Sequence, residues 1–155
     1  EEIMSRRLAR ETALQVLFQF DMNQDLEEKE ASLDLEIKKW AEEFAVPEGS
    51  IPFAQELIKG TLAEKERIDE EIEKLSEGWP LARMANVDRN LLRLACYELF
   101  YREDIPARVT INEAIEIAKR YGGDESGKFI NGILDRIAES TNKKDEKDHG
   151  PISGN

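Results

Sequence analysis

Three arginines near the start of the chain share one side of a predicted helix. Arg6, Arg7 and Arg10 span an arc of about 100° at 100° per residue. Positive charge in the first turns of a helix opposes the helix dipole and costs roughly 0.3–1 kcal/mol per group. An anionic ligand reverses this sign, because guanidinium groups and free helix amides both attract phosphate. The cluster therefore favours phosphate binding, with solvated arginines or arginines paired to nearby glutamates as the alternative.

A lysine and a phenylalanine open the last predicted helix. Phe129 falls at the edge of that helix's apolar face, next to Lys128, and Lys119 and Arg120 close the preceding helix. An unpaired base can stack on such a ring while cations hold the backbone, which contributes about 1–3 kcal/mol per base. The alternative is that Phe129 forms the rim of the core. These residues therefore suit single-stranded RNA.

Few residues of the chain could support catalysis or metal binding. There is one cysteine, Cys96, and one histidine, His149, too few for a disulfide framework, a zinc site or a Cys/His nucleophilic pair. We find no Walker loop, GxGxxG or HExxH motif. No apolar run approaches membrane-spanning length, and the amino terminus lacks a signal-peptide hydrophobic region. We therefore predict a cytoplasmic protein that is not an enzyme and uses no cofactor.

The net charge of −12 is unevenly distributed along the sequence. Residues 21–80 hold 18 acidic and 7 basic side chains, whereas residues 81–140 hold 10 and 9. This layout allows a basic protein partner on one surface and an RNA strand on another. The alternative is that the acidic residues form a solvated helix face.

Apolar residues recur at helical spacing along most of the sequence, with no alternation typical of strands. We expect the stretch after Ser50 to be one helix through Leu75, with a slight bend at Gly60, and Gly78-Trp79-Pro80 to separate two halves. The helix containing Glu98 is apolar nearly all round, which is typical of a central helix. The predicted helices cover about 5–22, 33–44, 51–75, 86–103, 110–122 and 124–140.

Helix ends near the carboxyl end can be predicted from residue chemistry. Thr110 and Glu113 have capping-box spacing, and Gly122-Gly123 would end that helix. Asp124 would cap the next one. Gly127 and Gly132 lower helix propensity, which suggests close approach of another backbone or a ligand. Glu98 should be a buried structural carboxylate, paired with Arg102 or with the amides of a neighbouring helix start.

Four runs of sequence resemble the NusB family of bacterial transcription antitermination factors. They are SRRLARETALQVLFQ (5–19), LLRLACYEL (91–99), INEAIEIAK (111–119) and SGKFINGILD (126–135). The resemblance implies an all-α fold of two small helical bundles packed across one another, with about seven helices. It implies one domain over 1–140, with halves of about 5–77 and 81–140. Residues 141–155 are charged, and we expect a disordered tail.

The resemblance also implies a function and its residues. Such proteins bind the boxA segment of ribosomal RNA leader transcripts together with the ribosomal protein NusE, join elongating RNA polymerase and suppress premature termination. The arginines at the chain's start and the ring at the start of the last helix are expected to share one exposed rim. The residues expected to bind RNA are Arg6, Arg7, Arg10, Glu125, Lys128 and Phe129, and those expected to contact NusE are Phe18 and Asp88.

Two other functions are compatible with the same residues. One is an RNA-recruiting module of a ribosomal RNA cytosine methyltransferase, which would need a further cofactor-binding domain. The other is a helical adaptor that binds only proteins. Phe18, or the region of Phe100 and Tyr101, could also be buried in a homodimer.

Overall fold

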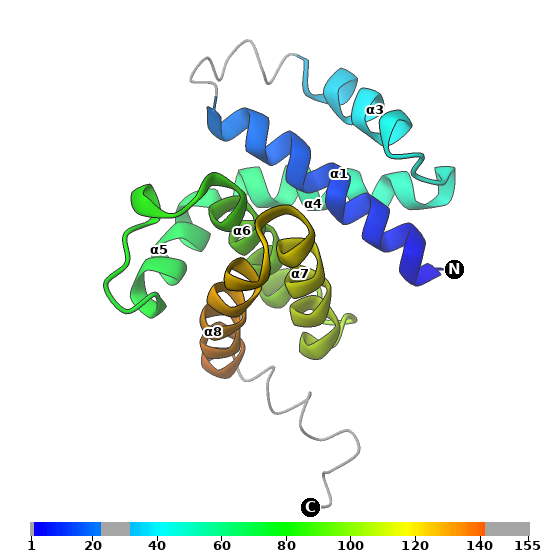
Figure 1. The fold of residues 1–155 in the computed structure, drawn as a ribbon. Coiled ribbons are helices and arrows are strands. Elements are labelled where there is room, and N and C mark those ends of the chain that lie inside the picture. The colour runs from blue at the N-terminus through cyan, green and yellow to red at the C-terminus, as the bar shows by residue number, and fades with distance from the viewer. Residues whose placement is uncertain (1, 23–31, 142–155) are drawn as a thin grey trace, which may run out of the picture. The chain divides into compact units, whose positions relative to one another are not determined.

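The computed structural model describes residues 2–22 and 32–141, which contain seven α-helices, two short 3-10 helices and no strand (Figure 1). The predicted all-α class is confirmed. The chain forms two compact units, Glu1–Ala63 and Glu64–Asn155. The tail expected over 141–155 lies outside the described residues from 142 onward. No described helix is both long and apolar enough to cross a bilayer.

The first unit is built around the amino-terminal helix. Helix α1 (Glu2–Met22) packs on α3 (Leu33–Glu43) and on α4 (Ile51–Ala63), and the short η1 (Glu48–Ser50) leads into α4. Because α1 contacts two helices, it needs apolar residues over a broad arc. Its buried apolar residues are Ala9, Ala13, Leu14, Val16, Leu17 and Phe20.

The second unit is built around α6 (Asn86–Tyr101). This helix packs on α5 (Lys65–Leu75), α7 (Ala107–Gly122) and α8 (Asp124–Ser140), and η2 (Leu81–Arg83) precedes it. Every residue of α6 from Asn90 to Leu99 is buried. An apolar helix with three neighbours inside its unit is what the sequence predicted for this segment.

The units divide earlier in the chain than the Gly78-Trp79-Pro80 break suggested. The expected long helix is interrupted at Glu64, where α4 has ended and α5 begins one residue later. Helix α5 is joined to α6 by polar contacts: Arg93 donates from Nε and Nη2 to the Asp69 carboxylate at 2.8 and 3.0 Å. Tyr101 adds a hydrogen bond to Glu64 at 2.9 Å. These contacts place α5 with α6.

The expected capping box at Thr110 is wrong. Helix α7 begins at Ala107, after the extended Pro106, so Thr110 lies within the helix. Its hydroxyl donates to Glu98 Oε1 on α6 at 2.9 Å, and both residues are buried. A buried carboxylate needs a hydrogen-bond donor. The Thr110 hydroxyl is that donor, so it does not cap the start of its own helix. Glu98 is thus the buried structural acid expected, with a threonine as a partner.

The joint between α7 and α8 follows the expected chemistry closely. Gly123 has φ 90°, a left-handed conformation that glycine adopts without steric cost, and it separates the two helices. Asp124 is the first residue of α8, one position later than a cap. Gly127 is buried, and a Cβ there would lie 3.0 Å from Lys119 Cγ of α7. Its predicted close approach is therefore to a side chain, whereas Gly132 has open space beside it.

Candidate nucleic-acid interface

The three arginines of α1 differ in how much of each side chain reaches solvent. Arg6 and Arg7 are half-buried, whereas Arg10 is only 4% exposed. The guanidinium carbons of Arg6 and Arg10 lie 4.6 and 5.3 Å from the centre of the Phe53 ring on α4. Such contacts are favourable, and more so when desolvated. The ring therefore orients both side chains within the first unit.

The burial of Arg10 differs from the solvent-facing cluster that the helical projection suggested. The neighbouring Glu11 is also buried, at 2% exposure. Helix α1 packs on α3 and α4 together, which leaves a narrower exposed arc than the residue types imply. Leu14 is buried and Phe18 is half-buried, as expected for a helix that packs against two neighbours. Arg6 and Arg7 are then the residues of the cluster with side chains that reach solvent.

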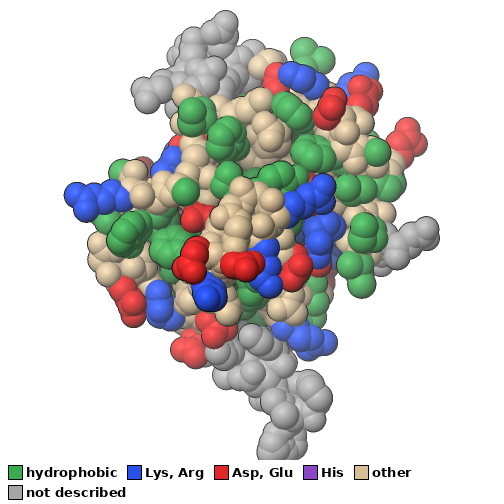
Figure 2. Space-filling view, in the orientation of Figure 1, with side chains coloured by type: hydrophobic (Ala, Val, Ile, Leu, Met, Phe, Trp, Pro, Cys, Tyr) green, Lys and Arg blue, Asp and Glu red, His purple; other side chains and the backbone are tan. Residues whose placement is uncertain are grey.

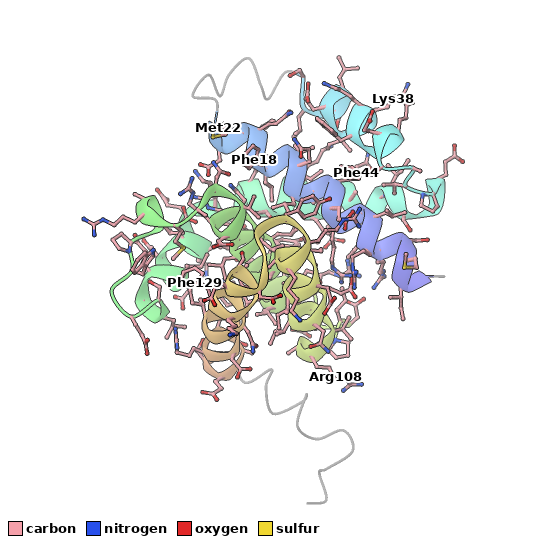
Figure 3. All side chains as sticks on the ribbon, in the orientation of Figure 1. Phe18, Met22, Lys38, Phe44, Arg108 and Phe129 are labelled. Carbon is pink, nitrogen blue, oxygen red and sulfur yellow. The ribbon has the colours of Figure 1, made fainter. Side chains whose placement is uncertain are left out.

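The charged residues at the start of α8 lie in solvent. The side chains of Lys128 and Glu125 are 77% and 92% exposed, and Lys128 Nζ lies 4.0 Å from Glu125 Oε2. A pair so exposed contributes little to stability. The lysine can therefore exchange this carboxylate for a phosphate at small cost. Phe129, the next residue, is half-buried (Figure 3).

A polar contact fixes the turn that carries these residues. Ser126, in the first turn of α8, donates a hydrogen bond to Asp88 in the first turn of α6. A Cβ at Gly122 would lie 2.6 Å from Ser126 Oγ, so glycine makes room for the hydroxyl. Burial raises the pKa of Asp88, and the Ser126 hydrogen bond opposes that rise. Asp88 thus positions the start of α8, and its contact with NusE stays a prediction.

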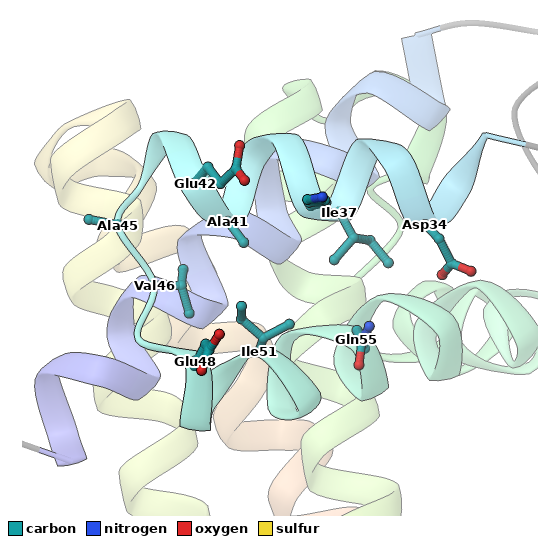
Figure 4. A pocket seen from close by; sticks show the side chains of 10 residues that line it. Asp34, Ile37, Ala41, Glu42, Ala45, Val46, Glu48, Ile51 and Gln55 are labelled. Carbon is teal, nitrogen blue, oxygen red and sulfur yellow. The ribbon is translucent and has the colours of Figure 1, made fainter.

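The first unit also has a groove between α3 and α4 (Figure 4). It has a volume of about 450 Å³, with Ile37, Val46 and Ile51 among its apolar lining residues. Asp34 and Glu42 are at its rim, and both are exposed. The lining also holds Glu48 and Lys38, and Asp34 is paired with Lys59 at 2.9 Å. Three acids and one lysine around an apolar floor suit a basic segment of a protein better than they suit RNA.

The described residues offer no metal or nucleophilic site. Within 2–22 and 32–141, no three His, Cys, Asp or Glu side chains are grouped to hold a metal ion. Cys96 is fully buried on α6, and burial raises the pKa of its thiol, which disfavours the reactive thiolate.

Basic and acidic side chains are interspersed on the face shown in Figure 2. Phosphate binding on that face would therefore depend on individual basic side chains and not on a continuous basic patch.

The sequence model of the NusB family matches residues 7–139, which is most of the chain. This chain belongs to the NusB family. A relative, the transcription antitermination protein NusB of Desulfitobacterium hafniense (strain DSM 10664 / DCB-2), is 71% identical over 150 residues, with 97% of this chain and 99% of the relative covered.

Solved NusB structures agree with this assignment. T. maritima NusB has a TM-score of 0.72 and 42% identity, covering 90% of this chain and 96% of its own. The crystal structure of the antitermination factors NusB and NusE in complex with dsRNA gives a TM-score of 0.74 at 30% identity, over 88% of this chain and 98% of the other. The family resemblance seen in the sequence is confirmed. NusB proteins are antitermination factors, in agreement with the prediction that this chain is not an enzyme.

The predicted NusB site residues lie in both units. Arg6, Arg7 and Arg10 belong to the first unit, and Glu125, Lys128 and Phe129 to the second. That the two sets share one rim stays a prediction. Phe18 of the predicted NusE contact lies on α1 one turn before Met22, which is 63% exposed (Figure 3).

Two residues that accompany Phe129 in the structure were not predicted as site residues from the sequence. Ser126 was passed over, although a hydroxyl in the first turn of a helix is a familiar sign of a polar contact. Trp79 was used only to mark a chain break, yet it is 51% exposed and its ring centre lies 6.5 Å from that of Phe129. Helical periodicity cannot identify a loop residue of this kind, since the loop has no repeating face.

Proposed function

We propose that this chain is a transcription antitermination factor. It binds a boxA-like single strand of ribosomal RNA leader together with the ribosomal protein NusE, and acts in the cytoplasm on elongating RNA polymerase. The D. hafniense relative is a transcription antitermination protein and is 71% identical to this chain, which supports a role in antitermination. The solved complex of NusB and NusE with dsRNA, at 30% identity, supports both partners. The observation that carries the RNA role is the exposed Lys128 beside the half-buried Phe129.

In the second unit, the start of α8 supplies a stacking ring and a cation. Phe129 stacks a base, and Lys128 binds a neighbouring phosphate in place of Glu125. Glu125 itself can accept hydrogen bonds from a base edge, since its side chain is 92% exposed. The contact between Asp88 and Ser126 holds this turn before RNA arrives, which reduces the ordering cost of binding.

In the first unit, the arginines of α1 hold the RNA backbone. Arg6 and Arg7 contact phosphates, because their side chains reach solvent. Arg10 lies with Arg6 over the Phe53 ring, so its role is to position Arg6 and to add positive potential beside it.

The protein partner engages acidic and apolar surface. Exposed acids beside the α3–α4 groove, such as Glu42 and Glu48, complement a basic ribosomal protein. Phe18 and Asp88 remain the proposed NusE contacts. Complementary charge of this kind raises the association rate and its dependence on salt.

An RNA gel shift with and without NusE tests this function. We expect a boxA-like single strand to bind the chain alone, more tightly with NusE present, and less tightly in a scrambled strand. A duplex of the same sequence shows whether an unpaired strand is required. Binding of NusE without any RNA shift under all conditions would favour the protein-binding adaptor instead. Equal shifts of boxA and scrambled strands would leave only non-specific phosphate binding.

A further inference from the structure

Trp79 and Phe129 form an exposed aromatic corner in the second unit. Their ring centres are 6.5 Å apart and their planes meet at 69°, an edge-to-face arrangement. Trp79 is 51% exposed, and Phe129 is half-buried. A tryptophan that serves only the core is rarely so exposed, since its ring has the largest apolar area of any side chain.

The loop that carries Trp79 is held by several contacts. The Trp79 amide donates to Ser76 O at 3.1 Å, and Ser76 Oγ donates to Trp79 O at 2.7 Å. Glu77 and Gly78 have φ of 55° and 83°, so two consecutive left-handed residues make the turn. A loop closed by reciprocal hydrogen bonds presents its ring in a defined orientation.

An arginine on α8 joins this loop to the helix that bears Phe129. Arg136 Nε donates to Leu75 O at 2.8 Å, and its Nη1 lies 3.5 Å from Glu77 Oε2. The ion pair also offsets the negative charge of Glu77 beside the tryptophan, which would otherwise repel phosphate. The two rings are therefore carried by one connected piece of the second unit.

We propose that Trp79 is a second stacking platform for RNA, which binds the base next to the one on Phe129. This inference rests on the proposed RNA-binding function. Neighbouring bases of a regular duplex lie in nearly parallel planes, whereas rings inclined at 69° require two bases that are turned apart. The corner therefore selects a bent, unpaired strand, and Lys128 lies beside it to hold the backbone.

Substitution of Trp79 tests its contribution to affinity. We expect Trp79→Ala to weaken binding of a boxA-like single strand about tenfold, within the range for loss of one stacked base. Trp79→Phe should retain most of the affinity, because it keeps an aromatic face. Leu35→Ala removes another exposed apolar side chain, 70% exposed on α3, and should leave affinity unchanged. Thermal unfolding of each variant checks that the fold is retained.

Fluorescence gives an independent test. Trp40→Phe leaves Trp79 as the sole tryptophan, because the chain has two. A saturating boxA-like single strand should quench its emission, and the corresponding duplex should quench it less. Normal RNA affinity of Trp79→Ala together with unchanged emission on binding would overturn the stacking role alone. Failure of the wild-type chain to bind the RNA would instead overturn the proposed function.

Discussion

Both candidate regions combine a phenylalanine ring with positively charged side chains, but these groups are more deeply buried in one region than in the other. In the first unit, Phe53 is buried at 8% exposure and the guanidinium groups of Arg6 and Arg10 lie over it. In the second, Phe129 is half-buried and Lys128 lies in solvent with its side chain 77% exposed. The first arrangement ties charge to the packing of helices. The second keeps both groups available to a ligand.

A basic cluster can therefore both stabilise the fold and bind a ligand. An arginine that is 4% exposed cannot be removed without disturbing the packing around it. An exposed lysine at a helix start can be changed with little effect on the fold. Loss of RNA binding after mutation therefore has different meanings in the two units, and stability must be measured beside affinity.

The largest expected effect comes from Arg10→Ala. We expect it to lower the free energy of unfolding by about 2–3 kcal/mol, because a desolvated cation–π contact and buried stem packing are lost together. Urea unfolding measures this change. Arg7→Ala is the matched control on the same helix, and it should change stability by less than about 0.5 kcal/mol. Equal stability of the two variants would show that Arg10 is not tied to the packing of the first unit.

The next effect compares the two phenylalanines directly. Phe53→Leu should cost about 1–2 kcal/mol of stability, since it removes the ring under two guanidinium groups. Phe129→Leu should leave stability nearly unchanged but weaken RNA binding about fivefold, through a loss of stacking on the order of 1 kcal/mol. Urea unfolding measures the stability of both variants, and RNA titration measures their affinities. The reverse pattern would mean that Phe129 is core and Phe53 contacts RNA.

A smaller effect is expected for Lys128→Gln. RNA affinity should fall about threefold, and the slope of log affinity against log salt should drop by about 0.7, the amount for one phosphate contact on a single strand. Titrations at several salt concentrations measure the slope. Glu125→Gln is the matched control, since it keeps a hydrogen-bond acceptor but removes the opposing charge, and it should strengthen binding slightly. An unchanged slope in Lys128→Gln would show that this amine does not contact phosphate.

The smallest effect concerns the pH dependence of the turn that carries Phe129. Burial raises the pKa of Asp88 above its ordinary value of 3.8 in the folded chain. The folded state then binds the proton more tightly than the unfolded state, so this group's contribution to stability falls as pH rises from about 3.8 through the folded pKa. In Asp88→Asn the amide oxygen can still accept the hydrogen bond from Ser126. The amide does not titrate, so this variant should not lose that contribution to stability as the pH rises.

Urea unfolding of the wild type and Asp88→Asn across that pH range measures the difference. We expect the stability of the variant relative to the wild type to increase with pH and to level off near neutrality. Ser126→Ala serves as a control, because it removes the hydrogen bond without removing the carboxylate. A constant difference between wild type and Asp88→Asn at all pH values would show that Asp88 does not titrate in this way.

Helix positions were largely predictable from the sequence, because apolar spacing and glycine stops act locally. Helix α6 lies where its continuous apolar run indicated, and Gly123 separates α7 from α8. The break at Glu64 was not predictable in this way. It accompanies contacts between α5 and α6 such as Arg93 with Asp69, which join residues 24 positions apart. The same holds for Thr110, which bonds to Glu98 instead of its own helix start.

The candidate site was predictable in residue type but less so in exposure. The pairing of Lys128 with Phe129 was evident from adjacent residues. The burial of Arg10 depends on Phe53, which is distant in sequence and gave no signal of its own. Trp79 meets Phe129 across 50 positions, and only the folded loop brings the two rings together.

We propose that Arg7 of the first unit and Phe129 of the second each contribute to RNA affinity, and a double-mutant cycle with Arg7→Ala and Phe129→Ala measures both contributions. Affinity for a boxA-like single strand is measured for the wild type, both single variants and the double variant. We expect each single variant to weaken binding about five- to tenfold and the double variant about 25- to 100-fold. Wild-type affinity in the double variant, with the fold intact, would contradict the account.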